Sequence, residues 1–429
     1  MKKLSRLSMY LLIALLAFSS CGKDEVTEPA DSNNSGTGGD ETSAYKWTYE
    51  VDNSIRSEFV LDENDNIYFV GADYNDNFSL YSIDKTGQKN WSVDVSYNIG
   101  GTNLSSIMYA DGKIITTTTL GNIYCYDSNN GSLLWEKSMY SNSVAYSNNT
   151  LYVANYSIMS VELTISALNI ADGSEKWTRI ERKLVEPKIS VNNNIICVAC
   201  EDKNPYPYKF GMVVYKDNGS SCDSAWSVFS EGVSGNKPHK AIFDGQGNLY
   251  IQDGTSGKTV VYSYNENTGA ENWNVQIKDV DMANDVAMIY SSGKIIATYR
   301  SDDSWGIENS FASIDASTGA ILNSVEEGIH DENMLLLTGD DNLVSFTQDD
   351  QGVIHLLKYG IDGSLINTEA PDYAKDIMLS AYDNVRINGE GDLIILSGKY
   401  IYCAEHSFVK PVQGTWSSIN GNNQNTNSL

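Results

Sequence analysis

The chain has 429 residues, with 56 acidic and 29 basic side chains and a formal charge of −27. A field of this sign repels nucleic acid and anionic membrane surfaces, so we expect no nucleic-acid partner. Hydrophobic residues make up 41% of the chain, which is enough for a packed core, and 34 Gly and 27 Tyr beside 7 Pro favour many short strands joined by tight turns.

Residues 1–20 are typical of a secretory signal peptide. Three basic side chains precede the apolar run MYLLIALLAF, which is too short to remain as a membrane-spanning helix. Ser19 and Ser20 then lead to Cys21, and a cysteine directly behind small residues is typical of a lipidation site. We therefore predict export through the general pathway and lipidation of Cys21. The alternative is a plain signal peptide that ends near a cysteine by chance.

Residues 21–44 are predicted to form a flexible tether, because they have almost no apolar content and no periodicity. The first residues of this segment, CGKDE, resemble the lysine-plus-acid export tag of surface lipoproteins in the Bacteroidota. That resemblance implies an outer-membrane lipoprotein that is exposed at the cell surface and held in the membrane by its lipid alone.

One hairpin pattern recurs between residues 45 and 415. Seven turns carry a Gly, at steps of 42 to 50 residues: Gly87, Gly131, Gly173, Gly219, Gly269, Gly319 and Gly363. In five units a Trp follows on the next strand, namely Trp91, Trp135, Trp177, Trp226 and Trp273. Asn323 and Asn367 occupy that place in the last two units. Another strand of this kind, with Trp47, opens the region without a preceding hairpin.

A second pattern counts eight units. A turn rich in Asn, Asp and Gly, followed by a short apolar strand, recurs near Ile67, Ile114, Leu151, Ile195, Leu249, Ile295, Leu343 and Leu393. Four short strands at this period are typical of one propeller blade. We therefore predict an all-β fold, an eight-bladed β-propeller of four-stranded antiparallel blades. The last blade lacks an outer strand, so we predict that the N-terminal strand at Trp47 supplies it and closes the ring.

The recurring residue types indicate how the blades pack. Gly accepts the positive φ that tight hairpins often require. A small side chain stands two residues before the Asp or Asn of the turn in five units, and before Glu405 in the last one: Ser82, Cys125, Ala167, Ser263, Ser313 and Cys403. We predict that the indole of one blade lies in the slot which this small residue leaves in the neighbouring blade. Trimming such an indole to Ala is expected to cost roughly 3–5 kcal/mol.

The spacing Asp-x-x-(x)-Gly-x-x-x-Trp resembles the tryptophan-docking repeat of the pyrroloquinoline-quinone-like eight-bladed propellers. The segment GTWSSINGNNQNTNSL, residues 414–429, also resembles the segment that flanks this domain, and we treat residues 416–429 as a tail. For members that are dehydrogenases, the resemblance implies a quinone over the central channel, a calcium ion, an Asp base and often a disulfide of adjacent cysteines. This chain has no Cys-Cys pair, no Cys-x-x-Cys-His and no long inserts, so we expect neither the quinone (PQQ) nor calcium nor another metal.

Two further motifs favour structural roles. The run CVAC, Cys197 to Cys200, has the spacing of a redox dithiol, but it lies in a β-like run where a separation of three sends the side chains to opposite faces. We predict buried, inert cysteines. The run DENDN, Asp62 to Asn66, lacks the Gly of a calcium loop and is predicted to be a solvated turn. We predict no catalytic set.

A binding surface is easier to argue. In four-stranded blades, the loops between the second and third strands open on one face. Two of these loops are enlarged, EDKNPYPYKF and RSDDSWGIEN, and ADYNDNF precedes them in the first blade. Aromatic side chains among acids on such loops suit a protein partner or a sugar ring. The predicted binding face consists of Tyr74, Tyr206, Tyr208, Trp305, Asp202, Asp302 and Asp303. Taken singly, each aromatic could instead fold back over its blade.

These observations predict a non-enzymatic binding platform for a protein or glycan partner. One alternative is a PQQ-dependent quinoprotein dehydrogenase. The other is a periplasm-facing scaffold in outer-membrane protein assembly, because the predicted architecture resembles the propeller lipoprotein of the β-barrel assembly machinery.

Overall fold

The computed structural model describes residues 45–75, 77–95, 104–118, 121–157, 159–203, 209–230, 239–255, 258–279, 287–300, 309–329, 335–348, 353–372, 384–411 and 422. The chain divides into two units, Met1–Thr42 and Ser43–Leu429, and every described residue belongs to the second. Within the described ranges, no helix is long and apolar enough to cross a membrane.

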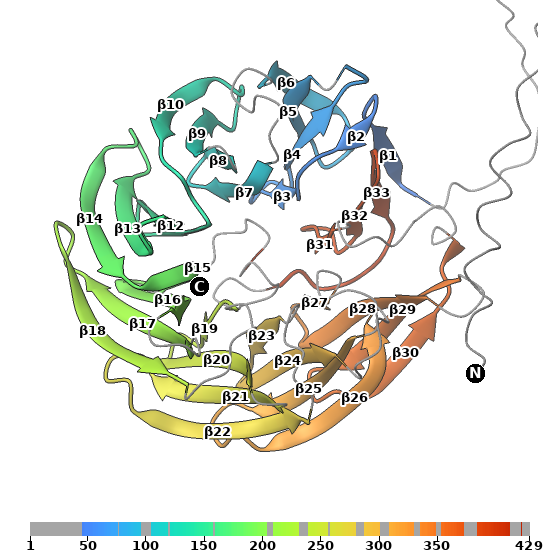
Figure 1. The fold of residues 1–429 in the computed structure, drawn as a ribbon. Helices are drawn as coiled ribbons and strands as arrows, with labels where there is room; N and C mark the ends of the chain where they lie inside the picture. Colours follow the sequence, from blue (N-terminus) through green and yellow to red (C-terminus); the bar gives the residue numbers. More distant parts are fainter. Residues whose placement is uncertain are drawn as a thin grey trace, which may run out of the picture. The chain divides into compact units, whose positions relative to one another are not determined.

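The described strands form eight antiparallel sheets, the blades, which stand around a common axis (Figure 1). Blade 1 contains β2 (Ser54–Ile55) and β3 (Val60–Leu61) as two pieces of one inner strand, then β4 (Ile67–Ala72), β5 (Phe78–Ile83) and β6 (Lys89–Asp94). Blade 2 contains β7 (Leu104–Ala110), β8 (Lys113–Thr118), β9 (Asn122–Asp127) and β10 (Leu133–Ser138). Blade 3 contains β11 (Ser143–Ser147), β12 (Thr150–Ser157), β13 (Glu162–Asn169) and β14 (Glu175–Arg182). Blade 4 contains β15 (Leu184–Asn192), β16 (Ile195–Asp202), β17 (Lys209–Asp217) and β18 (Cys222–Phe229).

The second half of the ring follows the same order. Blade 5 contains β19 (Ile242–Phe243), β20 (Asn248–Thr255), β21 (Lys258–Asn265) and β22 (Glu271–Lys278). Blade 6 contains β23 (Met288–Ser291), β24 (Lys294–Arg300), β25 (Asn309–Asp315) and β26 (Ile321–Ile329). Blade 7 contains β27 (Leu336–Leu337), β28 (Asn342–Gln348), β29 (Ile354–Gly360) and β30 (Leu365–Glu369). Blade 8 contains β31 (Asn384–Ile387), β32 (Leu393–Ser397), β33 (Tyr400–Ala404) and β1 (Trp47–Glu50).

The two ends of the propeller meet in blade 8. Strand β1 pairs antiparallel with β33, with Trp47 opposite Cys403 and Glu50 opposite Tyr400 (Figure 1). The prediction of eight four-stranded blades, closed by the N-terminal strand, is confirmed. The outer edge of β33 is thereby covered, as ring closure requires.

The order of strands gives the propeller two different faces. Turns between first and second strands, and between third and fourth strands, lie on one face, which we call the turn face. Connections between second and third strands, and between blades, lie on the opposite face, which we call the loop face. The core lies between adjacent blades, where for example the rings of Tyr68 and Tyr109 stack with centroids 5.8 Å apart. Inner and middle strands such as β4 are buried along their whole length, whereas β6 alternates between exposed and half-buried residues.

The turns between first and second strands are of two kinds. Blades 2, 3, 4 and 6 use two residues, and the first of them has a positive φ, as for Asn148 at 49°. Blades 1, 5, 7 and 8 use five residues, and the side chain of the first accepts hydrogen bonds from backbone N–H groups within the turn. In blade 1, Asp62 Oδ1 accepts from Asn64 (2.9 Å) and Asn66 (2.8 Å). Asp62 is buried, so this turn is held by its own carboxylate and is not the solvated turn predicted from DENDN.

Five indoles lie against the turn Gly of the following blade. A Cβ on that Gly would stand 2.5–2.8 Å from the indole, and the indole N–H donates to a backbone carbonyl of the same turn at 2.9–3.1 Å. The pairs are Trp47 with Gly87, Trp91 with Gly131, Trp135 with Gly173, Trp226 with Gly269 and Trp273 with Gly319. Trp177 instead donates to the Asp217 carboxylate at 2.9 Å, because the turn of blade 4 is built differently.

The prediction of which residue receives each indole was wrong. The small residues do not receive the indole of a neighbouring blade; they pair with the Trp of their own blade, as Ser82 does with Trp91 and Cys125 with Trp135. A small cross-strand partner leaves room for a large ring on the same face of the sheet. The turn Gly of the next blade forms the slot, because only a residue without Cβ lets the indole approach so closely.

In two units of the repeat, Asn stands in place of Trp, and the contacts of the structure account for both. Asn323 still reaches the next blade, where its Nδ2 donates to the Gly363 carbonyl at 3.0 Å. Asn367 has no such target, because blade 8 takes its outer strand from the N-terminus and so has no turn between its third and fourth strands.

The turn carboxylates predict how stability depends on pH. Asp315 Oδ1 accepts hydrogen bonds from the backbone and hydroxyl groups of Ser317 and Thr318 at 2.7–3.0 Å, and these bonds lower the pKa of this carboxyl below 3.8. A carboxyl group whose pKa is lower in the folded chain than in the unfolded chain stabilises the fold at pH values above the unfolded pKa. That stabilisation is lost as the pH falls through the folded pKa. We expect the urea midpoint to decrease below about pH 4. Asp315→Asn should make the fall of the urea midpoint at acid pH less steep. The midpoint at neutral pH should change little, because Asn265 accepts the same hydrogen bonds in the turn of blade 5. If the acid pH dependence of the urea midpoint were the same in Asp315→Asn, the Asp315 carboxylate would not be a source of it.

Candidate functional site

The structure describes two residues of the predicted binding face. Tyr74 lies in the loop between β4 and β5, and 77% of its surface is exposed, so it does not fold back over its blade. Asp202 ends β16 on the same face and is half-buried. The remaining members, Tyr206, Tyr208, Asp302, Asp303 and Trp305, lie outside the described residues, as does Cys21.

On the loop face of blades 1 to 3, two further exposed apolar side chains were not predicted from the sequence. Tyr140, in the connection from β10 to β11, is 60% exposed, and its ring rests on Gly121, where a Cβ would lie 2.7 Å from the ring. Met159, in the loop between β12 and β13, is fully exposed. The repeat pattern could not find them, because neither position recurs from blade to blade. With Tyr74, they place apolar side chains on the loop face of blades 1 to 3.

The backbone beside Met159 is strained. Val161 has a φ of 52°, although a β-branched residue rarely adopts a positive φ, and Lys183 and Glu186 have φ values of 74° and 53°. Hydrogen bonds link these segments across two blades: Lys183 N donates to Val161 O at 2.7 Å, and Lys203 N donates to Lys183 O at 2.9 Å. Strain of this kind costs of order 1–3 kcal/mol per residue and tends to gather at functional sites.

The same part of the loop face is acidic. Glu186 sits at the irregularity where β15 shifts register between Val185 and Lys188. Burial and then the nearby charge of Glu186 raise the pKa of Glu201, so these two carboxyl groups are close enough to interact. With Asp202 next to Glu201, this region favours cationic groups on a partner.

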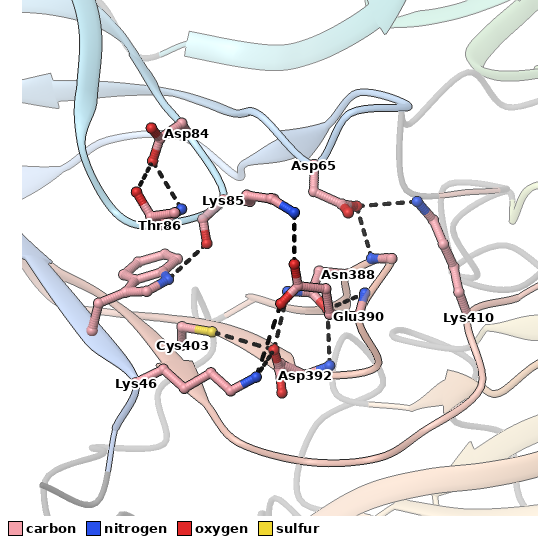
Figure 2. Close-up of polar contacts among 12 residues, drawn as sticks. Lys46, Asp65, Asp84, Lys85, Thr86, Asn388, Glu390, Asp392, Cys403 and Lys410 are labelled. Carbon is pink, nitrogen blue, oxygen red and sulfur yellow. Dashed lines mark hydrogen bonds and ion pairs between the residues drawn. The ribbon is translucent and has the colours of Figure 1, made fainter.

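On the opposite face, polar contacts lock the two ends of the chain together (Figure 2). Lys46 Nζ donates to Asp392 Oδ2 at 2.8 Å, and the side chain of Asp392 is fully buried. Lys85 Nζ pairs with Glu390 Oε1 at 2.7 Å. The hydrogen bond to Asp392 raises the pKa of Lys46. We call this group of four residues the closure seam, because it joins blade 8 to the first strands of the propeller.

The segment after β33 crosses the turn face. We call residues 405–411 the C-terminal strap. It binds three neighbouring turns. Phe408 N donates to Gly391 O at 3.0 Å in blade 8, and Gly339 N donates to Val409 O at 2.6 Å in blade 7. Lys410 Nζ donates to Asp65 Oδ1 at 3.1 Å in blade 1, as Figure 2 shows. A Cβ at Gly391 would stand 2.1 Å from Phe408 O, so only Gly fits beneath the strap.

A cavity of about 420 Å³ opens beside the strap on the turn face. Its walls come from the turns of blades 5, 6 and 7. The lining residues are Asp244, Gln246, Tyr290, Ser291, Ser292, Gly293, Leu337, Thr338, Gly339 and Asp341.

Two basic side chains, Lys240 and Arg386, lie at or next to the innermost strands. Lys240 lies two residues before β19, and burial followed by the charge of Lys188 lowers the pKa of Lys240 to about 7, while Glu58 acts in the opposite direction. Arg386 of β31 is fully buried and lies 5.6 Å from the Phe59 ring centroid. In the described part of the chain, no group of three His, Cys, Asp or Glu side chains is placed to hold a metal ion.

The CVAC cysteines lie on opposite faces of β16. Cys197 packs in the core toward blade 5, with its Sγ 3.6 Å from Met212 Sδ, and Cys200 packs in the core toward blade 3. Both are fully buried, and burial raises the pKa of each thiol well above its usual range. Neither thiol is therefore poised for redox chemistry.

The comparisons with known proteins agree with this fold. Residues 39–206 match the family model described as "Outer membrane protein assembly factor BamB". This span covers blades 1 to 3 and the first half of blade 4. The search of curated proteins finds no match.

Solved structures resemble the chain over most of its length. The quinohemoprotein alcohol dehydrogenase ADHIIG from Pseudomonas putida HK5 is 10% identical, with a TM-score of 0.58 over 86% of this chain and 77% of the other. The computationally designed Ika8 protein is 12% identical, with a TM-score of 0.55 over 83% and 98%. BamB from Moraxella catarrhalis is 13% identical, with a TM-score of 0.46 over 75% and 86%. The resemblance to the PQQ-like propellers is thus confirmed for the fold. A fold shared by an enzyme and a designed protein does not assign an activity.

Proposed function

We propose that this chain is a non-enzymatic propeller of the cell envelope that binds another protein through its loop face. One observation carries the proposal: Tyr74, Tyr140 and Met159 are exposed and lie in loops on the loop face of blades 1 to 3. These blades are also the part of the chain that matches a family described as an assembly factor. Exposed aromatic and Met side chains are typical anchors of protein interfaces.

The partner's chemistry follows from the surface. Apolar side chains on blades 1 to 3 lie on the same face as Glu186, Glu201 and Asp202 of blade 4, and the whole chain carries a charge of −27. The proposed partner therefore presents an apolar patch bordered by Lys or Arg, and its association should slow as the salt concentration rises. Lipidation of Cys21 would hold the propeller at the outer membrane through the tether of residues 21–44.

Site-specific photo-crosslinking in cells tests the proposal. A photoreactive residue at positions 74, 140 and 159 should crosslink to the same partner protein, whereas the exposed turn-face positions 129 and 317 should not. The triple variant Tyr74→Ala, Tyr140→Ala, Met159→Ala should bind the purified partner at least about tenfold more weakly, because loss of interface anchors typically costs more than 1 kcal/mol each. Crosslinks from the turn face alone would refute the loop-face assignment.

Each of the two alternative functions has one direct test. Purified protein mixed with PQQ and calcium should show neither a bound-cofactor spectrum nor dye reduction with alcohols or sugars; both together would favour the dehydrogenase. Protease treatment of intact cells distinguishes surface exposure from the periplasm-facing assembly scaffold.

A further inference from the structure

Asp341 lines the cavity on the turn face and is equivalent in strand register to Asp65. Asp65 is already paired with the ammonium group of Lys410. In blade 1, Leu61 pairs with Ile67 and encloses a five-residue turn whose fourth residue is Asp65. In blade 7, Leu337 pairs with Leu343 around a turn of the same length, and its fourth residue is Asp341. Asp65 and Asp341 have φ values of 62° and 57°, and the N–H of each donates to the first residue of its turn at 3.2 Å.

Both carboxylates also accept hydrogen bonds from the preceding blade, but the groups that donate to them differ. Asp65 accepts a hydrogen bond from Gly389 N at 2.8 Å, and the remaining position at Oδ1 is taken by the Lys410 ammonium of the strap at 3.1 Å. Asp341 accepts hydrogen bonds from the hydroxyls of Ser291 and Ser292 and lines the cavity. The C-terminal strap thus supplies an ammonium group to Asp65, whereas Asp341 lies at the cavity.

The lining contains a second carboxylate, Asp244, but its oxygens already accept hydrogen bonds from Gln246 N, Asn248 and the Tyr250 hydroxyl. The other polar groups of the lining are neutral. Gln246 Nε2 donates to the Tyr290 hydroxyl at 3.3 Å, a long bond that a ligand oxygen could replace. The hydroxyls of Ser291 and Ser292 can turn from Asp341 to a ligand, because a hydroxyl both donates and accepts. The volume of about 420 Å³ lies within the usual range of small-molecule sites.

We propose that this cavity binds the primary ammonium group of a small hydroxylated molecule, such as an amino sugar, with Asp341 as the charged partner. Ser291, Ser292 and Gln246 then bind the hydroxyl groups of the ligand. The site is independent of the loop-face function, since it lies on the opposite face of the propeller. The acidic charge of the chain would draw cationic ligands toward it and disfavour anionic sugars.

Titration calorimetry with glucosamine, below the pKa of its amine, tests the proposal on the purified chain. Glucosamine should bind with one site per chain. Glucose, which has the hydroxyls without the charge, and Nα-acetyl-lysine, which has the ammonium without the hydroxyls, should each bind at least about tenfold more weakly, because each lacks one set of contacts.

The variant Asp341→Asn should weaken glucosamine binding about tenfold or more, because a charge-assisted hydrogen bond is replaced by a neutral one. Asp111→Asn is the matched control: Asp111 lies in the corresponding turn of blade 2, is exposed and pairs with Lys113 at 3.7 Å. It should leave binding unchanged, and both variants should keep the parental melting temperature. Equal binding of glucose, equal binding of Nα-acetyl-lysine, no glucosamine binding, or an equal effect of the two variants would each overturn the proposal.

Discussion

Gly269→Ala is expected to destabilise the propeller by about 2–4 kcal/mol, because it combines a disfavoured φ with a steric clash. Gly269 has a φ of 70°, and a Cβ there would stand 2.5 Å from Trp226 Cδ2. The matched control is Gly219→Ala. Gly219 lies in the turn between the third and fourth strands of blade 4 with a φ of 86°, but a Cβ there would meet nothing within 4 Å. Its cost should be near 1 kcal/mol, the backbone contribution alone.

A double-mutant cycle separates the two contributions. In a Trp226→Ala background, Gly269→Ala should cost no more than Gly219→Ala does in the parent, because the clash is gone and the backbone cost remains. Urea unfolding of the four proteins, followed by tryptophan fluorescence and circular dichroism, measures the coupling. If Gly269→Ala and Gly219→Ala cost the same in the parent chain, the indole is not seated on the turn as described.

The repeat was predictable because each of its residues has a local reason that the sequence shows. A Gly at positive φ, an Asp or Asn that binds turn amides and a Trp four residues later appear as letters at fixed spacing. What the spacing could not show is which residue of the next blade receives the indole. Both the turn Gly and the small residue two positions before the Asp recur with the same period, so only the register of Ser82 opposite Trp91 separates them.

The candidate sites were less predictable for a related reason. Tyr140 and Met159 occur once each, and their exposure depends on how single loops fold. Likewise, the equivalence of Asp65 and Asp341 follows from strand pairing, because DENDN and TGDDN share few letters. The closure seam joins residues 346 positions apart, Lys46 and Asp392, and no local pattern predicts such a pair.

Trp47→Ala is expected to weaken the ring at its one non-covalent joint. Trp47 donates to Lys85 O at 2.9 Å and lies on Gly87, and its strand β1 is paired with β33 from the other end of the chain (Figure 1). Removing the indole should cost roughly 3–5 kcal/mol, as for other large-to-small core changes. Trp273→Ala removes the same type of contact between blades 5 and 6 and is the matched control.

The two variants should differ in where they open. Strands β21 and β22 follow one another in the chain, so loss of Trp273 should loosen one interface while the sheet of blade 5 stays intact. Loss of Trp47 should let β1 leave β33, and this exposes an unpaired strand edge that favours aggregation. Hydrogen exchange should therefore quicken in residues 47–50 and 400–404 for Trp47→Ala alone, and light scattering should rise on heating. Similar exchange in both variants would mean that the closing strand is held by its backbone pairing and the seam of Lys46 and Asp392, with the indole contributing only stability.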